Sequence, residues 1–230
     1  MDGVAVGIAV VFALVGVGLL AGRRMVGRAA LWVCVVAGAL GGLIAREGVS
    51  LAWEWLGPVG ALYRSAAAAL AQTVLAAGIG ELVKATVPLA LVGAVPSDGV
   101  AAMAYGAGAG AGFAVVLTHL EQGLAGALRL VGSPITTPLT TGLAVTGYLF
   151  PVLLHTGTTA YVARAGVRGG LGAAFLLAWA MQVASGLAAR LPLVGGVPVG
   201  RGVGAVLAVA LVAFLWRVRL RAERPAVSLD

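Results

Sequence analysis

The sequence predicts an all-α, polytopic membrane protein with about seven transmembrane helices, and three observations support this fold class. Hydrophobic residues make up 61% of the 230 residues and charged residues 10%, and the mean hydropathy of +1.06 is too high for a soluble domain. Several apolar runs reach the roughly 20 residues that cross a bilayer as a helix. Small residues are spread through every run with little alternation, which disfavours a transmembrane β-barrel.

The chain begins with two apolar segments that an arginine-rich turn joins. We expect helices at about residues 3–22 and 29–45. No basic stretch precedes the first segment, so we expect a retained helix and not a cleaved signal peptide. Residues 46–56 contain tryptophans flanked by charge, which is typical of a separate segment at the membrane interface.

The third and fourth helices are expected at about residues 66–95 and 100–118, with a tight turn between them. Pro88 lies inside the third helix and should kink it. Residues 119–131 are more polar, and we expect them to form a short connection.

The second half of the chain supplies three more helices, at about residues 134–162, 170–191 and 203–216, and then a basic tail at 217–230. Seven spans place the two termini on opposite sides of the membrane. If the N-terminus is outside, nine arginines are cytoplasmic and five are not, and this bias predicts an N-out, C-in topology with a cytoplasmic tail. The nine are Arg23, Arg24, Arg28, Arg164, Arg168, Arg217, Arg219, Arg221 and Arg224.

The composition also excludes several kinds of site. The net charge of +7 comes from arginines at segment ends, so it indicates membrane orientation and no nucleic-acid-binding patch. The single cysteine, Cys34, lies in an apolar segment, so we expect neither a disulfide framework nor a cysteine metal site. Because no internal repeat or soluble segment interrupts the chain, residues 1–230 are expected to form one transmembrane helical domain.

An acid and a base interrupt the third apolar segment. Glu81 and Lys84 are three residues apart and therefore share one face of a helix. A lone charge at bilayer depth costs about 2.5–3.5 kcal/mol on insertion scales, so such groups face the protein interior, usually in pairs. The pair either forms part of a functional site or only locks helix packing.

Helix geometry predicts that other polar groups lie at the depth of Glu81. At a rise of about 1.5 Å per residue, Glu81 lies about 21 Å from the end of its helix, His155 about 14 Å and Gln182 about 18 Å from the same side of the membrane. Spacings of seven and four residues place Tyr148, His155 and Thr159 on one face. His155 is either a hydrogen-bonded packing group, a metal ligand or a proton carrier.

The fourth helix has glycine at every second position from Gly106 to Gly112. These positions give two overlapping four-residue spacings of small residues, which are typical of close packing between membrane helices. The alternative is a slot that admits an extended peptide or a lipid beside Glu81.

Four segments together resemble the motifs of the membrane-embedded CAAX-protease and bacteriocin-processing superfamily, near its PrsW and YhfC groups of intramembrane metalloproteases. Residues 80–84 (Gly-Glu-Leu-Val-Lys) resemble its Glu-Glu-x-x-Lys/Arg motif, and residues 105–113 are similar to its glycine-rich second motif. Residues 154–160 resemble the third motif, a histidine followed four residues later by a small polar residue. Residues 180–186 stand where a final histidine motif is expected.

The resemblance implies site roles for individual residues. Glu81 would be a base or a zinc ligand, and His155 a zinc ligand or an acid that Thr159 orients. Lys84, Tyr148 and Gln182 would support them. The implied substrate is a membrane peptide or protein, the implied surroundings are membrane lipid, and the implied location is a prokaryotic plasma membrane.

Departures from the motifs favour a diverged homologue that is either inactive or altered in its chemistry. Gly80, Ala109, Phe113 and Gln182 replace a glutamate, a histidine, an acid and a histidine of the superfamily. Only Glu81 and His155 remain as metal ligands, where three protein ligands are usual. Two alternatives stay open: a transporter or small-molecule-binding subunit that uses the same polar layer, and a non-catalytic assembly protein whose basic tail binds anionic lipid or an acidic partner.

Overall fold

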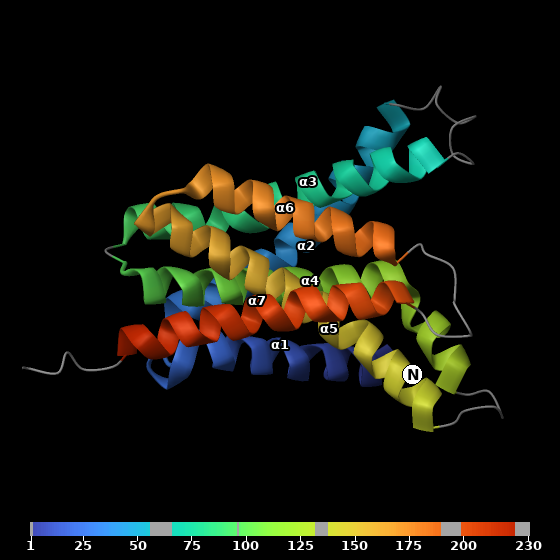
Figure 1. The fold of residues 1–230 in the computed structure, drawn as a ribbon, viewed down its shortest axis with the longest axis horizontal. Helices are drawn as coiled ribbons and strands as arrows, with labels where there is room; N and C mark the ends of the chain where they lie inside the picture. The colour runs from blue at the N-terminus through green and yellow to red at the C-terminus, as the bar shows by residue number, and fades with distance from the viewer. Residues whose placement is uncertain (1, 56–65, 96, 132–137, 190–198, 224–230) are drawn as a thin grey trace, which may run out of the picture.

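The computed structural model describes residues 2–55, 66–95, 97–131, 138–189 and 199–223, and in these ranges every regular element is an α-helix. Seven helices lie side by side in one bundle (Figure 1). They are α1 (Asp2–Val26), α2 (Ala29–Trp55), α3 (Ala66–Ala94), α4 (Gly99–Val131), α5 (Pro138–Arg168), α6 (Leu171–Ala188) and α7 (Val199–Glu223). The predicted all-α class is confirmed.

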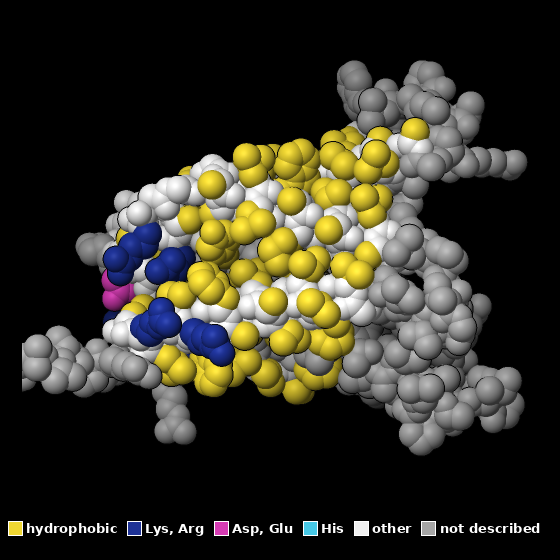
Figure 2. Space-filling view, viewed as in Figure 1, with side chains coloured by type: hydrophobic (Ala, Val, Ile, Leu, Met, Phe, Trp, Pro, Cys, Tyr) yellow, Lys and Arg dark blue, Asp and Glu magenta, His cyan; other side chains and the backbone are white. Residues whose placement is uncertain are grey.

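Five of these helices are long and apolar enough to cross a membrane, counted over the described residues. The candidate spans are Ala29–Ala52, Leu70–Ala94, Gly99–Leu117, Leu171–Ala188 and Gly202–Glu223, and α1 adds a shorter apolar stretch, Ala9–Gly22. Hydrophobic side chains cover the flank of the bundle in Figure 2, while arginine side chains gather at one end. These features indicate an integral membrane protein with transmembrane helices.

Helix α4 is the centre of the bundle, and every residue from 101 to 114 is buried. Its glycines pack against two neighbouring helices, α5 and α2. A β-carbon at Gly106 or Gly110 would collide with backbone carbonyls of α5, and one at Gly112 would collide with the Val35 carbonyl of α2. Neighbouring backbones therefore lie directly against these glycines, which matches close helix packing.

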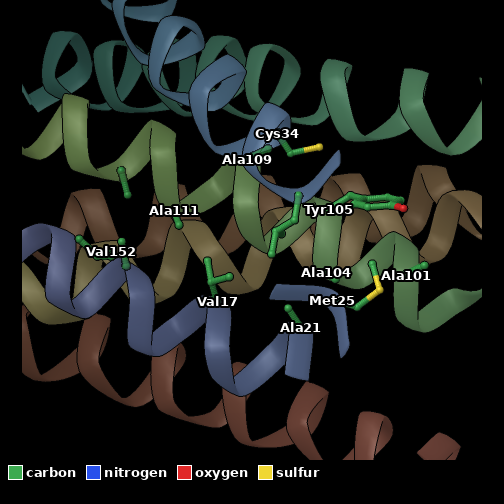
Figure 3. Packing of buried hydrophobic residues seen from close by; sticks show 13 residues of the cluster. Val17, Ala21, Met25, Cys34, Ala101, Ala104, Tyr105, Ala109, Ala111 and Val152 are labelled. Carbon is green, nitrogen blue, oxygen red and sulfur yellow. The ribbon is translucent and has the colours of Figure 1, made fainter. Parts of the chain in front are cut away.

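Small side chains also form the core. One buried cluster lies where α4 meets α1, α2 and α5, and Figure 3 shows its side chains converging from these helices. Tyr105 is its largest member, and most of the others are alanines. A second cluster joins α4 and α5 to α7 through Leu153, Leu211 and Leu215. Because neighbouring lipid chains are as apolar as this core, close van der Waals contact between small residues is what favours helix association here.

Several predicted boundaries were wrong in the same way, since the helices continue past their charged residues. Helix α2 runs on through residues 46–55, so these do not form a separate interfacial segment. Helix α4 includes residues 119–131, and α7 includes residues 217–223 of the predicted tail. Arginine, glutamate, leucine and alanine are good helix formers, so a charged residue does not by itself end a helix. The candidate spans Ala29–Ala52 and Gly202–Glu223 also include charged residues.

The end of α1 is tied to the end of α7. Gly22 adopts φ 70° and ψ 167°, which interrupts the helix within Asp2–Val26. The guanidinium of Arg219 donates hydrogen bonds to the carbonyls of Gly18, at 3.3 Å, and of Leu19. Glu223 lies 3.4 Å from Arg219 Nε. Carbonyls at the break in α1 thus find their donor on another helix.

The packing of α4 predicts a contrast between two glycines. Gly112→Ala places a methyl group against the α2 backbone and is expected to destabilise the protein by about 1–3 kcal/mol, as overpacking does. Gly93→Ala in α3 meets no atom within 4 Å and serves as the matched control. Thermal unfolding in detergent should show a lower Tm for the first variant alone, and equal shifts would contradict the packing described.

Candidate functional site

Glu81 and Lys84 are fully buried on α3 and form a salt bridge through Glu81 Oε1 and Lys84 Nζ. Small residues beside them bring α3 close to its neighbours. Gly80 faces the Phe113 ring of α4, and Gly78 faces the Trp179 ring of α6. The Trp179 indole donates a hydrogen bond of 3.0 Å to the Val74 carbonyl, which fixes α6 against α3.

The ammonium group of Lys84 has two more partners on α5. Its Nζ donates to Thr158 Oγ1 at 3.0 Å and lies 3.0 Å from His155 Nδ1. An ammonium group is only a donor, so Nδ1 accepts, and the ring hydrogen of the neutral imidazole lies on Nε2. With Glu81, Thr158 and His155 as acceptors, all three hydrogens of the ammonium group have a partner.

Gln182 of α6 completes the network. Its Nε2 lies 3.1 Å from His155 Nδ1 and 3.4 Å from Thr158 Oγ1. Thr158 in turn donates to Glu81 Oε1 at 3.3 Å or to the His155 carbonyl at the same distance. Side chains from three helices therefore meet in one hydrogen-bonded cluster, which we call the polar network: Glu81, Lys84, His155, Thr158 and Gln182.

Phe113 of α4 covers one side of the polar network. Its ring centroid lies 5.3 Å from that of His155, with the planes tilted by 51°, and 5.7 Å from Lys84 Nζ. The second distance is within range of a cation–π interaction. Phe113 thus keeps water from one face of the ammonium group and adds attraction to it.

A groove of about 510 Å³ lies next to the polar network, which we call the network groove. Its other lining residues come from four helices and extend toward the N-terminal end of α3: Val49, Gln72, Thr73, Ala76, Ala77, Gly80, Phe113, Leu117 and Gly186. Glu81 Oε2 is buried here and has no hydrogen-bond partner among the described residues. Beside the groove there is thus one buried acceptor that the protein side chains described here leave unused.

The structure brings together four of the six predicted site residues: Glu81, Lys84, His155 and Gln182. Thr159 is buried, but its hydroxyl donates to the His155 carbonyl at 2.9 Å within α5, so it does not orient the imidazole as expected. The side chain of Tyr148 is outside the described part of the structure. Thr158 of the polar network and Phe113, which covers it, were not predicted, although Thr158 follows His155 by three residues and so shares its face.

The donor set does not fit a zinc centre. Zinc needs about three protein ligands at roughly 2.0–2.2 Å for nitrogen and oxygen. Across the described residues, no three His, Cys, Asp or Glu side chains are grouped so that they could hold a metal. The Lys84 ammonium contacts both predicted ligands, Glu81 and His155, and so takes the place that a cation would occupy between them.

Comparison of the chain with protein-family models, with curated proteins and with solved structures found no match in any of the three. The class that the fold and the site define is an α-helical membrane protein with a buried ionic network beside a groove.

Charge balance in the polar network predicts a non-additive effect on stability. Lys84→Met leaves the Glu81 carboxylate buried without a cation, and the expected loss is about 3–5 kcal/mol. The double variant Glu81→Gln/Lys84→Met removes both charges and should recover most of that loss. Denaturant unfolding in mixed micelles measures both.

Thr86→Val is the control for this experiment, because Thr86 lies on the exposed side of α3 and bonds only to the Leu82 carbonyl in its own helix. Its effect should stay within about 0.5 kcal/mol. A double variant as unstable as Lys84→Met would show that the pair is not balanced as described.

Proposed function

We propose that this protein is a diverged homologue of the YhfC/PrsW-like intramembrane metalloproteases that binds a membrane peptide or protein segment in the network groove without hydrolysing it. The observation that carries the proposal is the Lys84 ammonium between Glu81 and His155. The meeting of Glu81, His155 and Gln182 from α3, α5 and α6 supports the relationship, because the resemblance implies that these motif positions face one another.

Hydrolysis of a peptide bond needs a cation or donors that stabilise the developing oxyanion. Lys84 is the nearest cation in the polar network, and its three hydrogens already bind Glu81, His155 and Thr158. A substrate carbonyl would have to displace one of these partners. The charges of the polar network are therefore satisfied within the network, and catalysis would require at least one of these hydrogen bonds to break.

Binding of a membrane segment fits the same atoms better than its hydrolysis does. Glu81 is one of the residues that line the groove, and its buried carboxylate oxygen Oε2 lacks a donor among the described residues. A backbone N–H or a hydroxyl of a bound segment would satisfy it with a charge-assisted hydrogen bond. Ala76, Ala77 and Gly186 leave room for a bound chain along the groove.

The orientation that we propose is N-out and C-in, in a prokaryotic plasma membrane. Helix α1 begins at one end of the bundle, and α7 ends at the other, where arginine side chains gather (Figures 1 and 2). This distribution supports the positive-inside assignment. In that orientation the network groove extends from the polar network toward the outer side.

A second candidate function is a small-molecule-binding or transporting subunit. The observation that favours it is the same unpartnered Glu81 Oε2 beside His155, since intramembrane carboxylates and histidines often carry coupling protons. In proteoliposomes, a proton flux that Glu81→Gln abolishes would select this function over peptide binding.

Metal content and proteolysis test the absence of hydrolysis. Mass spectrometry of the detergent-purified protein should find no stoichiometric zinc in the wild type, Glu81→Ala or His155→Ala, and a panel of membrane peptides should stay uncleaved. Near-stoichiometric zinc that both substitutions remove, together with cleavage, would overturn the proposal.

Photo-crosslinking tests binding directly. A benzoylphenylalanine at Ala76, inside the groove, should give a discrete protein adduct in membranes that weakens when Glu81→Gln is added. The same probe at Leu82, which is 60% exposed and outside the groove lining on the same helix, is the control and should give no such adduct. The absence of an adduct from Ala76, or the same adduct from both positions, would contradict the proposal.

A further inference from the structure

Three arginines surround a crevice at the end of the bundle opposite the N-terminal end of α1. Arg164 and Arg168 near the end of α5 line it together with Arg221 of α7, and its volume is about 360 Å³. Its remaining lining residues are Gly99, Val100, Met103, Val218 and Ala222. We call this feature the arginine crevice. It is separate from the network groove, since the two share no lining residue.

The helices direct these arginines to one place. Arg164 and Arg168 are one turn apart on α5, and both pack over Gly99, where a β-carbon would lie 3.0 Å from Arg168 Nε and 3.8 Å from Arg164 Cγ. On α7, Arg219 is held by the carbonyls of α1, and Arg221, two residues further on and therefore on another side of the helix, lines the crevice. Two helices thus contribute positive charge from opposite sides.

Within the described residues, no hydrogen bond or ion pair neutralises the guanidinium groups of Arg164, Arg168 or Arg221. The nearby Asp98 makes no ion pair with them, and its Oδ1 accepts instead from the amides of Val100, at 2.9 Å, and Ala101, at 2.7 Å. Like charges gathered in this way repel one another unless an anion lies between them.

The crevice also has an apolar part that continues from the arginines. Val100, Met103 and Val218 line it next to the charged groups. The candidate membrane spans of α4 and α7 begin or end in this region, at Gly99 and Glu223. A ligand that matches both parts carries a phosphate for the arginines and hydrocarbon for the apolar side chains. Guanidinium groups bind phosphate oxygens in pairs, which suits a phosphate between two helices.

We propose that the arginine crevice binds the phosphate of an anionic phospholipid, whose acyl chains lie along the apolar surface of α4 and α7. The bound headgroup bridges α5 to α7 and offsets the repulsion between their arginines. A free phosphate would use the arginines alone, so the lipid is the source that accounts for the apolar lining as well.

Native mass spectrometry of the full chain, released from detergent with phosphatidylglycerol or phosphatidylcholine, measures this binding. The wild type should retain phosphatidylglycerol in preference to phosphatidylcholine. Arg164→Gln/Arg221→Gln should weaken phosphatidylglycerol binding about twentyfold, because each arginine near an anionic headgroup contributes roughly a factor of five. The matched control, Arg46→Gln/Arg217→Gln, removes two exposed arginines outside the crevice and should change binding by less than about twofold.

A second variant keeps the test valid if the double variant fails to fold. Val218→Glu adds a carboxylate at the crevice and removes no arginine, so it should abolish the preference for phosphatidylglycerol. Equal weakening in the crevice and control variants, or unchanged binding in Val218→Glu, would overturn the proposal. So would inorganic phosphate that displaces phosphatidylglycerol at equal concentration, because the source would then be free phosphate and not lipid.

Discussion

Burial of the Lys84 ammonium group is the constraint on which the arrangement of α3, α5 and α6 depends. A charge at this depth is tolerated only where acceptors surround it, and here Glu81, His155 and Thr158 supply them. The acceptors come from two helices, and Gln182 links a third. A buried ion pair often adds little net stability compared with apolar residues of the same shape. Here the ion pair fixes the relative position of the three helices, since the charges are satisfied in only one mutual register of these helices.

That register requires close approach, which the glycines of α4 permit. Gly110 lies against the carbonyl of His155, so the backbone of α5 sits directly on α4. Phe113, one turn further along α4, then reaches both the imidazole and the ammonium group. A larger residue at position 110 would push α5 away and lengthen the contact between His155 and Lys84. The satisfaction of the buried charges therefore depends on the close packing of the small residues.

The sequence predicted the polar network better than it predicted the ends of the helices. A single acid–base pair in an apolar run identified Glu81 and Lys84, and the fixed helical rise placed His155 and Gln182 at a similar depth. Thr159 was predicted from its four-residue spacing to His155 and from the resemblance to the third motif. Thr158, three residues from His155, shares that face, and only the packing of α5 against α3 decides between them. Phe113 gave no polar signal at all, and the helix ends were placed too early because charge was taken as a stop.

The hydrogens and acceptors of the polar network also limit what the groove can recognise. Lys84 has no hydrogen to spare, and Thr158 uses its one hydroxyl hydrogen within the cluster. Of the charged pair, only Glu81 Oε2 lacks a partner among the described residues. A ligand that offers an anion or a bare carbonyl to the pair would meet a carboxylate oxygen and no available cation. A ligand that offers an N–H or O–H group would satisfy a buried acceptor that otherwise costs about 1–3 kcal/mol, or more because it is charged. Under the proposed function, the network would therefore favour a ligand with free hydrogen-bond donors, such as the backbone N–H groups of an unwound membrane segment.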